Sequence, residues 1–191
     1  MWTRFCPHQV VRRVEDIDLA DLRARGVRAL LLDLDNTLTP WLGYEMTPAL
    51  QEWLVRAKQD FRLCLVSNQV RARRVRRIAE QLGIPRVHGL GPWGKPWSRI
   101  FRRALRLTGA APEQAAMIGD QLFTDIWGAR RAGLYAILVE PVSKRELSWT
   151  RMNRWLARWV ERHLRRRGQW PQEKRAGQAR CQGESDAVAK R

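Results

Sequence analysis

The fold is decided by the stretch Leu30-Leu31-Leu32-Asp33-Leu34-Asp35-Asn36-Thr37-Leu38. It begins as an unbroken apolar run and continues with two carboxylates spaced i, i+2. A run of this kind is typical of a strand that is buried on both faces, as in a parallel sheet. Asp33 and Asp35 then stand where the strand gives way to a loop, on the same side of the chain. Such a pair is tolerated if a cation lies between the carboxylates, or if one of them is protonated.

The composition indicates one globular domain with extensions, because 45% of the 191 residues are hydrophobic. The net charge is +17, and residues 141–191 alone carry +9. This excess either favours an anionic partner (nucleic acid, anionic lipid or a phosphorylated substrate) or reflects compositional bias, since arginine far outnumbers lysine. The three cysteines follow no disulfide or metal-binding pattern. With no long apolar run and no signal peptide in sight, we expect a cytoplasmic protein.

Apolar runs alternate with helical patterns through most of the chain. Glycines, prolines and capping residues separate them. Strands are predicted at residues 27–33, 61–66, 84–88, 115–118 and 134–139, and helices at 19–25, 48–58, 71–82, 98–107 and 126–132. Strands and helices that alternate at short spacing predict an α/β domain with a mainly parallel sheet, which we assign to residues 1–145.

Two segments lie outside this alternation. Residues 146–167 contain a predicted basic amphipathic helix, and residues 168–191 are polar and predicted to be a disordered basic tail. Five arginines alternate along the helix with a wide apolar face, formed by Trp149, Met152, Trp155, Leu156, Trp159, Val160 and Leu164. That face either packs on the domain or a partner, or lies on a membrane surface.

Polar side chains follow three of the predicted strands, and a lysine lies in the loop after a fourth. In open α/β sheets, ligands bind beyond the carboxyl ends of the strands. Several carboxylates gathered at such an edge suit Mg²⁺, which takes oxygen ligands and keeps coordination positions for water and phosphate. The expected members of the site are Asp33, Asp35, Ser67, Asn68, Lys95, Asp120 and Asp125.

Four short motifs carry a resemblance to a known family. In chain order they are Asp-Leu-Asp-Asn-Thr from Asp33, Val-Ser-Asn from Val66, Gly-Lys-Pro from Gly94, and Ile-Gly-Asp-Gln-Leu-Phe-Thr-Asp from Ile118. Together they resemble the haloacid dehalogenase (HAD) phosphatase superfamily, and the neighbourhoods of the first and last motifs look like the YqeG-type subfamily IIIA phosphatases. Relatives of that group include mitochondrial phosphatidylglycerophosphatases. The resemblance covers about residues 1–145, and it implies a Rossmann-like three-layer fold.

The resemblance also implies roles. Asp33 would be the nucleophile that forms an aspartyl-phosphate, and Asp35 would protonate the leaving oxygen and then activate water. Lys95 would neutralise charge on the transferring phosphoryl group. Substrate contacts are implied for Ser67, Asn68 and Lys95, and Mg²⁺ contacts for Asp33, Asp120, the backbone carbonyl of Asp35 and, as outer support, Asp125.

Several of these residues have a simpler interpretation. Asp33 and Asp35 could be turn formers, although an acid pair that closes a buried run argues against this. Ser67 could serve only as a helix cap, Lys95 could be a surface lysine, and Asp125 could cap its own helix.

The spacing between motifs leaves no room for a cap domain. Only residues 36–66 and 68–94 separate the motifs, and each stretch already contains a helix and a strand. An open site suits a phosphate displayed on something large. We therefore expect a Mg²⁺-dependent phosphomonoesterase that acts on phosphatidylglycerophosphate, in phospholipid biosynthesis. It would be peripheral at the inner membrane face through residues 148–167.

Two other functions remain open. The net charge of +17 and the basic tail are compatible with a nucleic-acid-binding or ribosome-associated protein built on the same scaffold. A phosphatase of a soluble sugar or nucleotide phosphate would use the same catalytic residues. The sequence fixes neither the natural substrate nor the oligomeric state.

Overall fold

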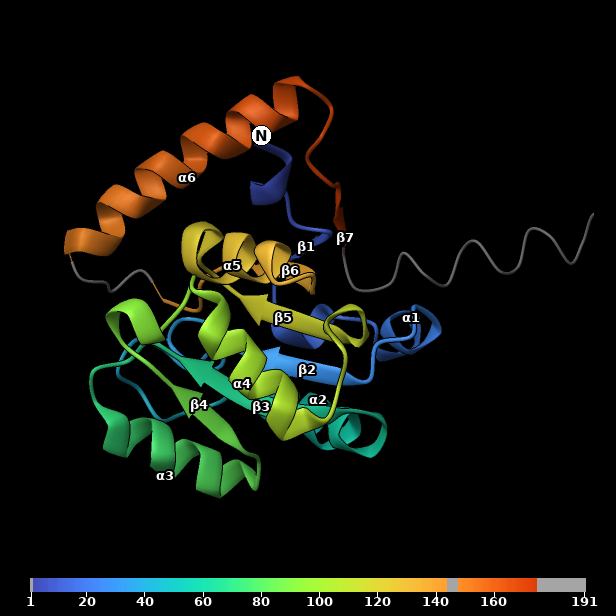
Figure 1. Ribbon diagram of the computed structural model, residues 1–191, viewed down its shortest axis with the longest axis vertical. Helices are drawn as coiled ribbons and strands as arrows, with labels where there is room; N and C mark the ends of the chain where they lie inside the picture. Colours follow the sequence, from blue (N-terminus) through green and yellow to red (C-terminus); the bar gives the residue numbers. More distant parts are fainter. Residues whose placement is uncertain (1, 144–147, 175–191) are drawn as a thin grey trace, which may run out of the picture.

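The computed structural model describes residues 2–143 and 148–174, which form a three-layer α/β fold (Figure 1). Within these residues seven strands make one sheet in the order β4-β3-β2-β5-β6-β1-β7, and all neighbouring strands are parallel. This confirms the predicted class and sheet type. The strands are β1 (Gln9–Val11), β2 (Ala29–Leu32), β3 (Arg62–Ser67), β4 (Arg86–His88), β5 (Ala115–Gly119), β6 (Tyr135–Val139) and β7 (Glu173–Lys174).

Six α-helices are found in the described residues, and their bounds lie close to those expected. They are α1 (Leu19–Ala24), α2 (Pro48–Asp60), α3 (Ala72–Leu82), α4 (Ser98–Thr108), α5 (Trp127–Arg131) and α6 (Ser148–Arg166). A π-helical turn, η5 (Leu122–Ile126), leads into α5, so the helix expected from residue 126 is preceded by a wider turn. Short 3-10 turns (η1, Trp2–Phe5; η2, Val14–Asp16; η3, Gly91–Trp93; η4, Pro112–Gln114) complete the chain.

The central strand β2 is buried on both faces, as its continuous apolar sequence predicts. Leu30 and Leu32 belong to a core shared with α1, α2 and α3. Ala29 and Leu31 belong to a second core shared with α4, α5 and α6. The sheet therefore lies between two layers of helices, with α4 and α5 in front of it and α2 behind it in Figure 1.

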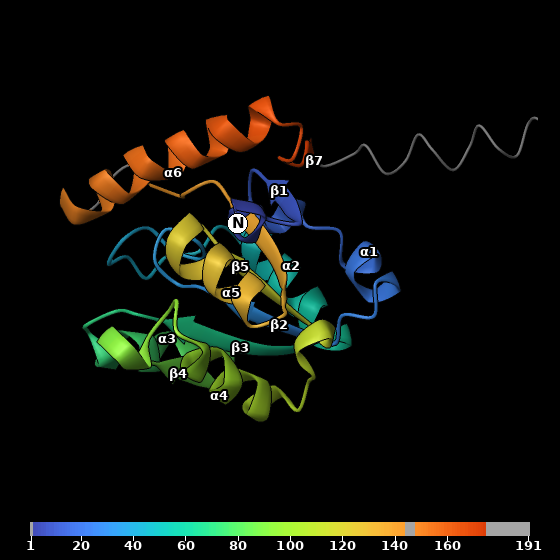
Figure 2. The same cartoon turned by 45° about the horizontal axis from the view of Figure 1, so that its top comes forward.

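The C-terminal segment differs from expectation in two respects. The apolar face of α6 divides: Val160 and Leu164 are buried in the second core, whereas Trp155, Leu156 and Trp159 are exposed. The side chains of Trp149 and Met152 lie outside the described residues. Figure 2 shows α6 along one side of the α/β body.

The first part of the predicted disordered tail, residues 168–174, is structured. Trp170 is buried, and Glu173–Lys174 pair in parallel with β1. A buried tryptophan supplies apolar contact that the polar composition of residues 168–191 conceals. Residues 175–191 lie outside the described part of the chain.

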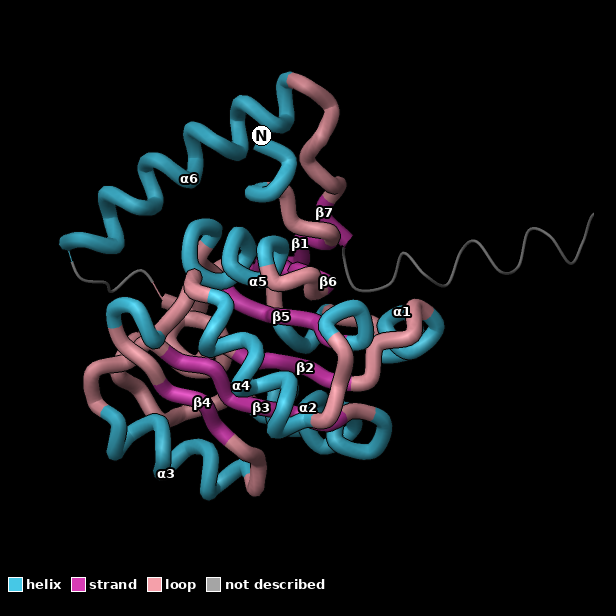
Figure 3. Tube along the Cα trace, in the orientation of Figure 1, coloured by secondary structure: helices cyan, strands magenta, loops and turns pink. Residues whose placement is uncertain are grey.

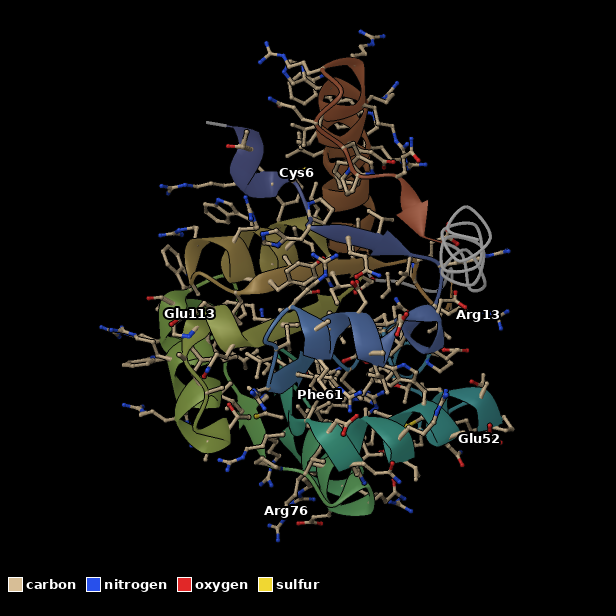
Figure 4. All side chains as sticks on the ribbon, turned by 90° about the vertical axis from the view of Figure 1, so that its right-hand side faces the viewer. Cys6, Arg13, Glu52, Phe61, Arg76 and Glu113 are labelled. Carbon is tan, nitrogen blue, oxygen red and sulfur yellow. The ribbon has the colours of Figure 1, made fainter. Side chains whose placement is uncertain are left out.

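All the strands run in parallel, so their carboxyl ends meet at one end of the sheet. Figure 3 shows the loops that follow β2, β3 and β4 gathered there. Figure 4 shows the opposite end, where Phe61 and Glu113 precede β3 and β5. Residues that follow strands far apart in sequence are thus brought to one place.

Candidate active site

Parallel pairing places three of the expected site residues side by side. Leu32 of β2 is level with Leu65 of β3 and with Ile118 of β5. Asp33 follows directly after β2, Ser67 is the last residue of β3, and Asp120 follows directly after β5. The central strand and its two neighbours therefore deliver their polar residues to the same edge, as predicted.

Four of the expected site residues form a charged cluster, the Asp33 cluster: Asp33, Lys95 and Asp125, which are buried, and Asp120, which is half-buried. The Lys95 ammonium contacts Asp33 Oδ1 and lies 2.7 Å from Asp125 Oδ1. Only 2% of the Lys95 side chain is exposed, so this lysine is not a surface residue. One oxygen from each of the three carboxylates lies within 4.8 Å of the others. This arrangement brings together the predicted nucleophile, the predicted cation and two predicted metal ligands.

Burial and the neighbouring charges shift the pKa values of Asp33 and Lys95. Burial raises the pKa of Asp33 to about 7, with Lys95 acting in the opposite direction and the Asp125 carboxylate adding to the increase. Burial alone would lower the pKa of Lys95, but the attraction of Asp125 and Asp33 outweighs it, so the pKa is raised and the lysine is charged. The neighbouring acids are thus only partly neutralised by the one ammonium that contacts them.

The cluster fits a divalent cation. Asp33 Oδ2 is buried and has no hydrogen-bond partner within the described residues, so one oxygen of the predicted nucleophile is available as a ligand. Three carboxylates are the hard oxygen donors that Mg²⁺ prefers. Gly119 allows this packing, because a Cβ there would lie 2.3 Å from Asp125 Oδ2. Asp125 itself accepts a hydrogen bond from the Gln121 backbone N–H and is fully buried.

Asp35 has separate surroundings. Its Oδ1 lies 2.9 Å from Arg74 Nη1 and accepts a hydrogen bond from the Leu42 backbone, and its Oδ2 accepts one from the Gln69 side chain at 2.9 Å. The side chain of Asp35 does not belong to the group of carboxylates that could hold a metal among the described residues. The side chains that could hold a metal are those of Asp33, Asp120 and Asp125, and the contribution expected from Asp35 is that of its backbone carbonyl.

Arg74 is a site residue that the sequence analysis missed. It is buried, whereas Arg73, Arg76 and Arg77 of the same helix are exposed. It also donates to Thr39 Oγ1 at 2.7 Å and to the Gly43 carbonyl at 3.0 Å. Its position beside Val75, and four residues before Ile78, places it on the buried stripe of α3, and that periodicity was the available signal.

Arg74 and Asp35 together fix the loop that follows β2. Leu42 has φ of 60°, which is unusual for a branched residue, and its N–H is held by Asp35. The carbonyl of the adjacent Gly43 accepts a hydrogen bond from Arg74. A buried ion pair thus anchors the predicted acid–base residue and a strained loop at once.

Ser67 and Asn68 make contacts that differ from those expected. The Ser67 hydroxyl accepts a hydrogen bond from the Gln69 N–H, and α3 begins only at Ala72, so Ser67 does not cap that helix. The Asn68 side chain accepts from the Lys95 N–H and donates to the Lys95 carbonyl, both at 2.7 Å. Asn68 was expected to contact substrate; in the structure its amide holds the backbone of Lys95.

The site is open. The segments between each strand and the following helix are residues 33–47 after β2, 68–71 after β3 and 89–97 after β4. None of these described segments contains a further domain, which agrees with the predicted absence of a cap.

Comparison with known proteins gives several likenesses. A family model described as HAD-hydrolase-like matches residues 92–147. Probable phosphatase YqeG from Bacillus subtilis is 37% identical over 169 residues, which are 87% of this chain and 96% of that protein. The chloroplastic phosphatidylglycerophosphate phosphatase 1 of Chlamydomonas reinhardtii is 29% identical, covering 72% of this chain and 53% of that protein.

A solved structure has a similar fold. An uncharacterized protein from Listeria monocytogenes serotype 4b matches with a TM-score of 0.51 and 23% identity, over 63% of this chain and 85% of that chain. At this level of identity the likeness supports the fold alone.

Proposed function

This chain belongs to the YqeG-type phosphatases of the haloacid dehalogenase superfamily, and on that premise we propose that it hydrolyses phosphate monoesters through an aspartyl-phosphate on Asp33. The observation that carries the proposal is the Asp33 cluster. A buried carboxylate contacts a buried ammonium beside two further carboxylates, at the open end of a parallel sheet. Phosphoryl transfer needs positioning and compensating charge more than elaborate covalent chemistry, and the cluster supplies both.

The reaction would proceed in two displacements. A carboxylate oxygen of Asp33 attacks phosphorus while the bond to the leaving oxygen breaks and Asp35 gives that oxygen its proton. Water then attacks the phosphorus and returns a proton to Asp35, and the bond to Asp33 breaks to release inorganic phosphate. Lys95 balances charge on Asp33 and on the transferring group throughout.

Mg²⁺ is the proposed cofactor. The residues that would hold it are Asp33, Asp120 and Asp125, whose oxygens already lie together. When bound, the cation would neutralise phosphate charge so that an anionic nucleophile can approach an anionic substrate. The backbone carbonyl of Asp35 is a further ligand that the family resemblance predicts.

We propose phosphatidylglycerophosphate as the substrate, with phosphatidylglycerol as the product. Support comes from the absence of a cap over the described site and from the likeness to a chloroplastic phosphatidylglycerophosphate phosphatase. Such a substrate would require peripheral contact with a membrane, at its cytoplasmic face. None of the helices in residues 2–143 and 148–174 has the length and apolar character needed to cross a bilayer.

Phosphate release by the purified protein with Mg²⁺ tests the proposal. The panel contains phosphatidylglycerophosphate in vesicles, a soluble sugar phosphate and a nucleoside monophosphate. We expect the lipid to be preferred, and Asp33→Asn to abolish release from every substrate. Asp60→Asn, at an exposed aspartate paired with Arg23, is the matched control and should leave release unchanged. Release that survives Asp33→Asn would exclude the mechanism, and preference for a soluble substrate would exclude the lipid.

A further inference from the structure

A surface pocket with a volume of about 560 Å³ lies between α4 and β4, outside the Asp33 cluster. Its floor includes Val87 and Ile100, which are buried. We call it the arginine pocket, since its walls carry Arg99, Arg102, Arg103 and Arg106 together with His88 and Trp93.

The arginine pocket concentrates positive charge. The four arginines are spaced i, i+3, i+4 and i+7, so they lie on one side of α4. None of them has an acidic partner within the described residues, and no acid lines the pocket. The Arg99 guanidinium lies over the Trp93 ring, 4.6 Å from its centroid, so an aromatic wall holds one of the charges. A helix face that is merely solvated has no need of a pocket or an aromatic wall. A site that binds an anionic ligand benefits from both, so these features favour a binding site.

The pocket and the active site lie on two sides of one loop. His88 lines the pocket at the end of β4, and its ring contacts the Gln69 carbonyl. Gln69 in turn donates to Asp35. The same loop, residues 89–97, carries Trp93 on the pocket and Lys95 in the Asp33 cluster. Figure 3 shows this loop among those at the carboxyl end of the sheet.

Large apolar side chains are exposed around this loop. We call them the rim: Val70, Leu90, Trp93 and Trp97, of which Val70 is 75% and Trp93 64% exposed. Tryptophan could stack on a nucleic-acid base, but valine and leucine offer a base no comparable contact. Tryptophan and aliphatic side chains beside arginines are, however, the composition found where proteins enter the interface of an anionic membrane.

We infer that the rim and the arginine pocket dock this protein on a bilayer containing anionic phospholipid, with a phosphate-bearing headgroup in the pocket. Docking in this way would present the neighbouring open site to headgroups in the same bilayer. The inference rests on the proposed function, because docking on a bilayer serves the enzyme only if its substrate is a lipid in that bilayer. It differs from the expectation that α6 makes the membrane contact.

The chain offers matched pairs for deciding between the two surfaces. Arg99→Gln with Arg103→Gln removes two charges spaced i, i+4 from the pocket, and Arg158→Gln with Arg162→Gln removes two charges of the same spacing from α6. Trp93→Ser on the rim is matched by Trp155→Ser on α6, because the two tryptophans are 64% and 61% exposed. Every variant changes side chains that are exposed in the structure.

Co-sedimentation of the full chain with vesicles measures docking. Vesicles of phosphatidylcholine alone are compared with vesicles of phosphatidylcholine mixed with phosphatidylglycerol. We expect binding only to the mixed vesicles and weakening with added salt. The double substitution in the pocket should lower the partition coefficient about thirtyfold, and the α6 pair should lower it much less. Trp93→Ser should likewise weaken binding more than Trp155→Ser.

Three results would overturn the inference: equal binding to both vesicle types, loss of binding only in the α6 variants, or loss of RNA binding in the pocket variant while vesicle binding persists. Docking is measured without turnover, and Asp33→Asn protein should dock normally. Vesicle binding without phosphate release would therefore refute the proposed function alone. Phosphate release from soluble substrates by a protein that does not bind vesicles would refute the docking surface alone.

Discussion

Asp33 and Asp35 lie two residues apart, and each contacts one buried cation, but the cations come from different parts of the fold. Lys95 reaches Asp33 from the loop before α4, and its ammonium is shared with Asp125. Arg74 reaches Asp35 from α3, and its other N–H groups donate hydrogen bonds to the Thr39 hydroxyl and the Gly43 carbonyl. The first pair lies within the carboxylate cluster and the second lies beside it.

This difference separates two uses of a buried cation. An ammonium is a compact point charge, suited to balancing charge that moves during a reaction. A guanidinium is a planar fork, suited to holding several acceptors in fixed positions. The Lys95 contact therefore serves charge compensation at Asp33, and the Arg74 contact serves the orientation of Asp35 and of the loop that follows β2.

Removal of the ammonium at Lys95 should have the largest effect. Lys95→Met keeps most of the side-chain volume but leaves Asp33 without its cation, and we expect kcat for a soluble phosphomonoester to fall about 10³-fold. Steady-state phosphate release measures this, and Lys58→Met, at an exposed lysine on α2, is the control. A loss no larger than tenfold would show that Lys95 does not compensate charge in the reaction.

Arg74→Gln should have a smaller effect on rate and a clear effect on stability. With the fork removed, Asp35 loses its orientation, and we expect kcat to fall about 10²-fold and the protein to lose about 3 kcal/mol of stability. Arg74→Lys keeps the charge but not the fork, so it should recover stability more than rate. The control is Arg73→Gln, at the exposed neighbouring position.

The two Arg74 variants also test whether Arg74 acts by orienting Asp35 and not by its charge alone. Phosphate release and thermal unfolding are measured on both proteins. Full recovery of rate in Arg74→Lys would mean that charge alone matters at Asp35, and the contrast with Lys95 would disappear.

The placement of Asp33 in the site was predictable from the sequence, whereas the contact of Arg74 with Asp35 was not. Asp33 and Asp120 follow buried apolar runs, and parallel strands bring such residues to one edge without knowledge of any side-chain contact. Arg74 is one of several arginines in one helix, and its partner is 39 residues away in the chain. Only the three-dimensional packing of α3 against the loop after β2 shows which arginine turns inward.

The strands of the sheet likewise divide into those that could be predicted from the sequence and those that could not. The five strands β2 to β6, which are consecutive in the sheet, alternate with helices along the chain and were predicted from that alternation. Strands β1 and β7 contain three and two residues, and both lie outside the alternation of apolar runs and helical patterns from which the other strands were predicted. Strand β1 pairs with β6, β7 pairs with β1, and Trp170 shortly before β7 is buried, so both short strands are recognised only from tertiary contacts.

The raised pKa of Asp33 predicts that metal binding depends on pH. Below a pKa of about 7 Asp33 is protonated in the folded protein, and a cation must displace that proton. The apparent affinity for Mg²⁺ should therefore rise about tenfold per pH unit up to about pH 7 and then level off. Calorimetric titration at several pH values measures this, and Asp33→Asn should remove the slope. A slope that persists in Asp33→Asn would assign the proton to another group.

Gln69→Ala should have the smallest effect. Gln69 donates one neutral hydrogen bond to Asp35 Oδ2, while Arg74 holds the other oxygen, so the carboxylate keeps its charged partner when the amide is removed. A bond of this kind is worth about 1 kcal/mol, and we expect kcat to fall about fivefold with little change in thermal stability. Gln51→Ala, which removes an exposed side-chain hydrogen bond on α2, is the control. A loss as large as that of Arg74→Gln would mean that both oxygens of Asp35 must be held, so that Arg74 alone does not orient the acid.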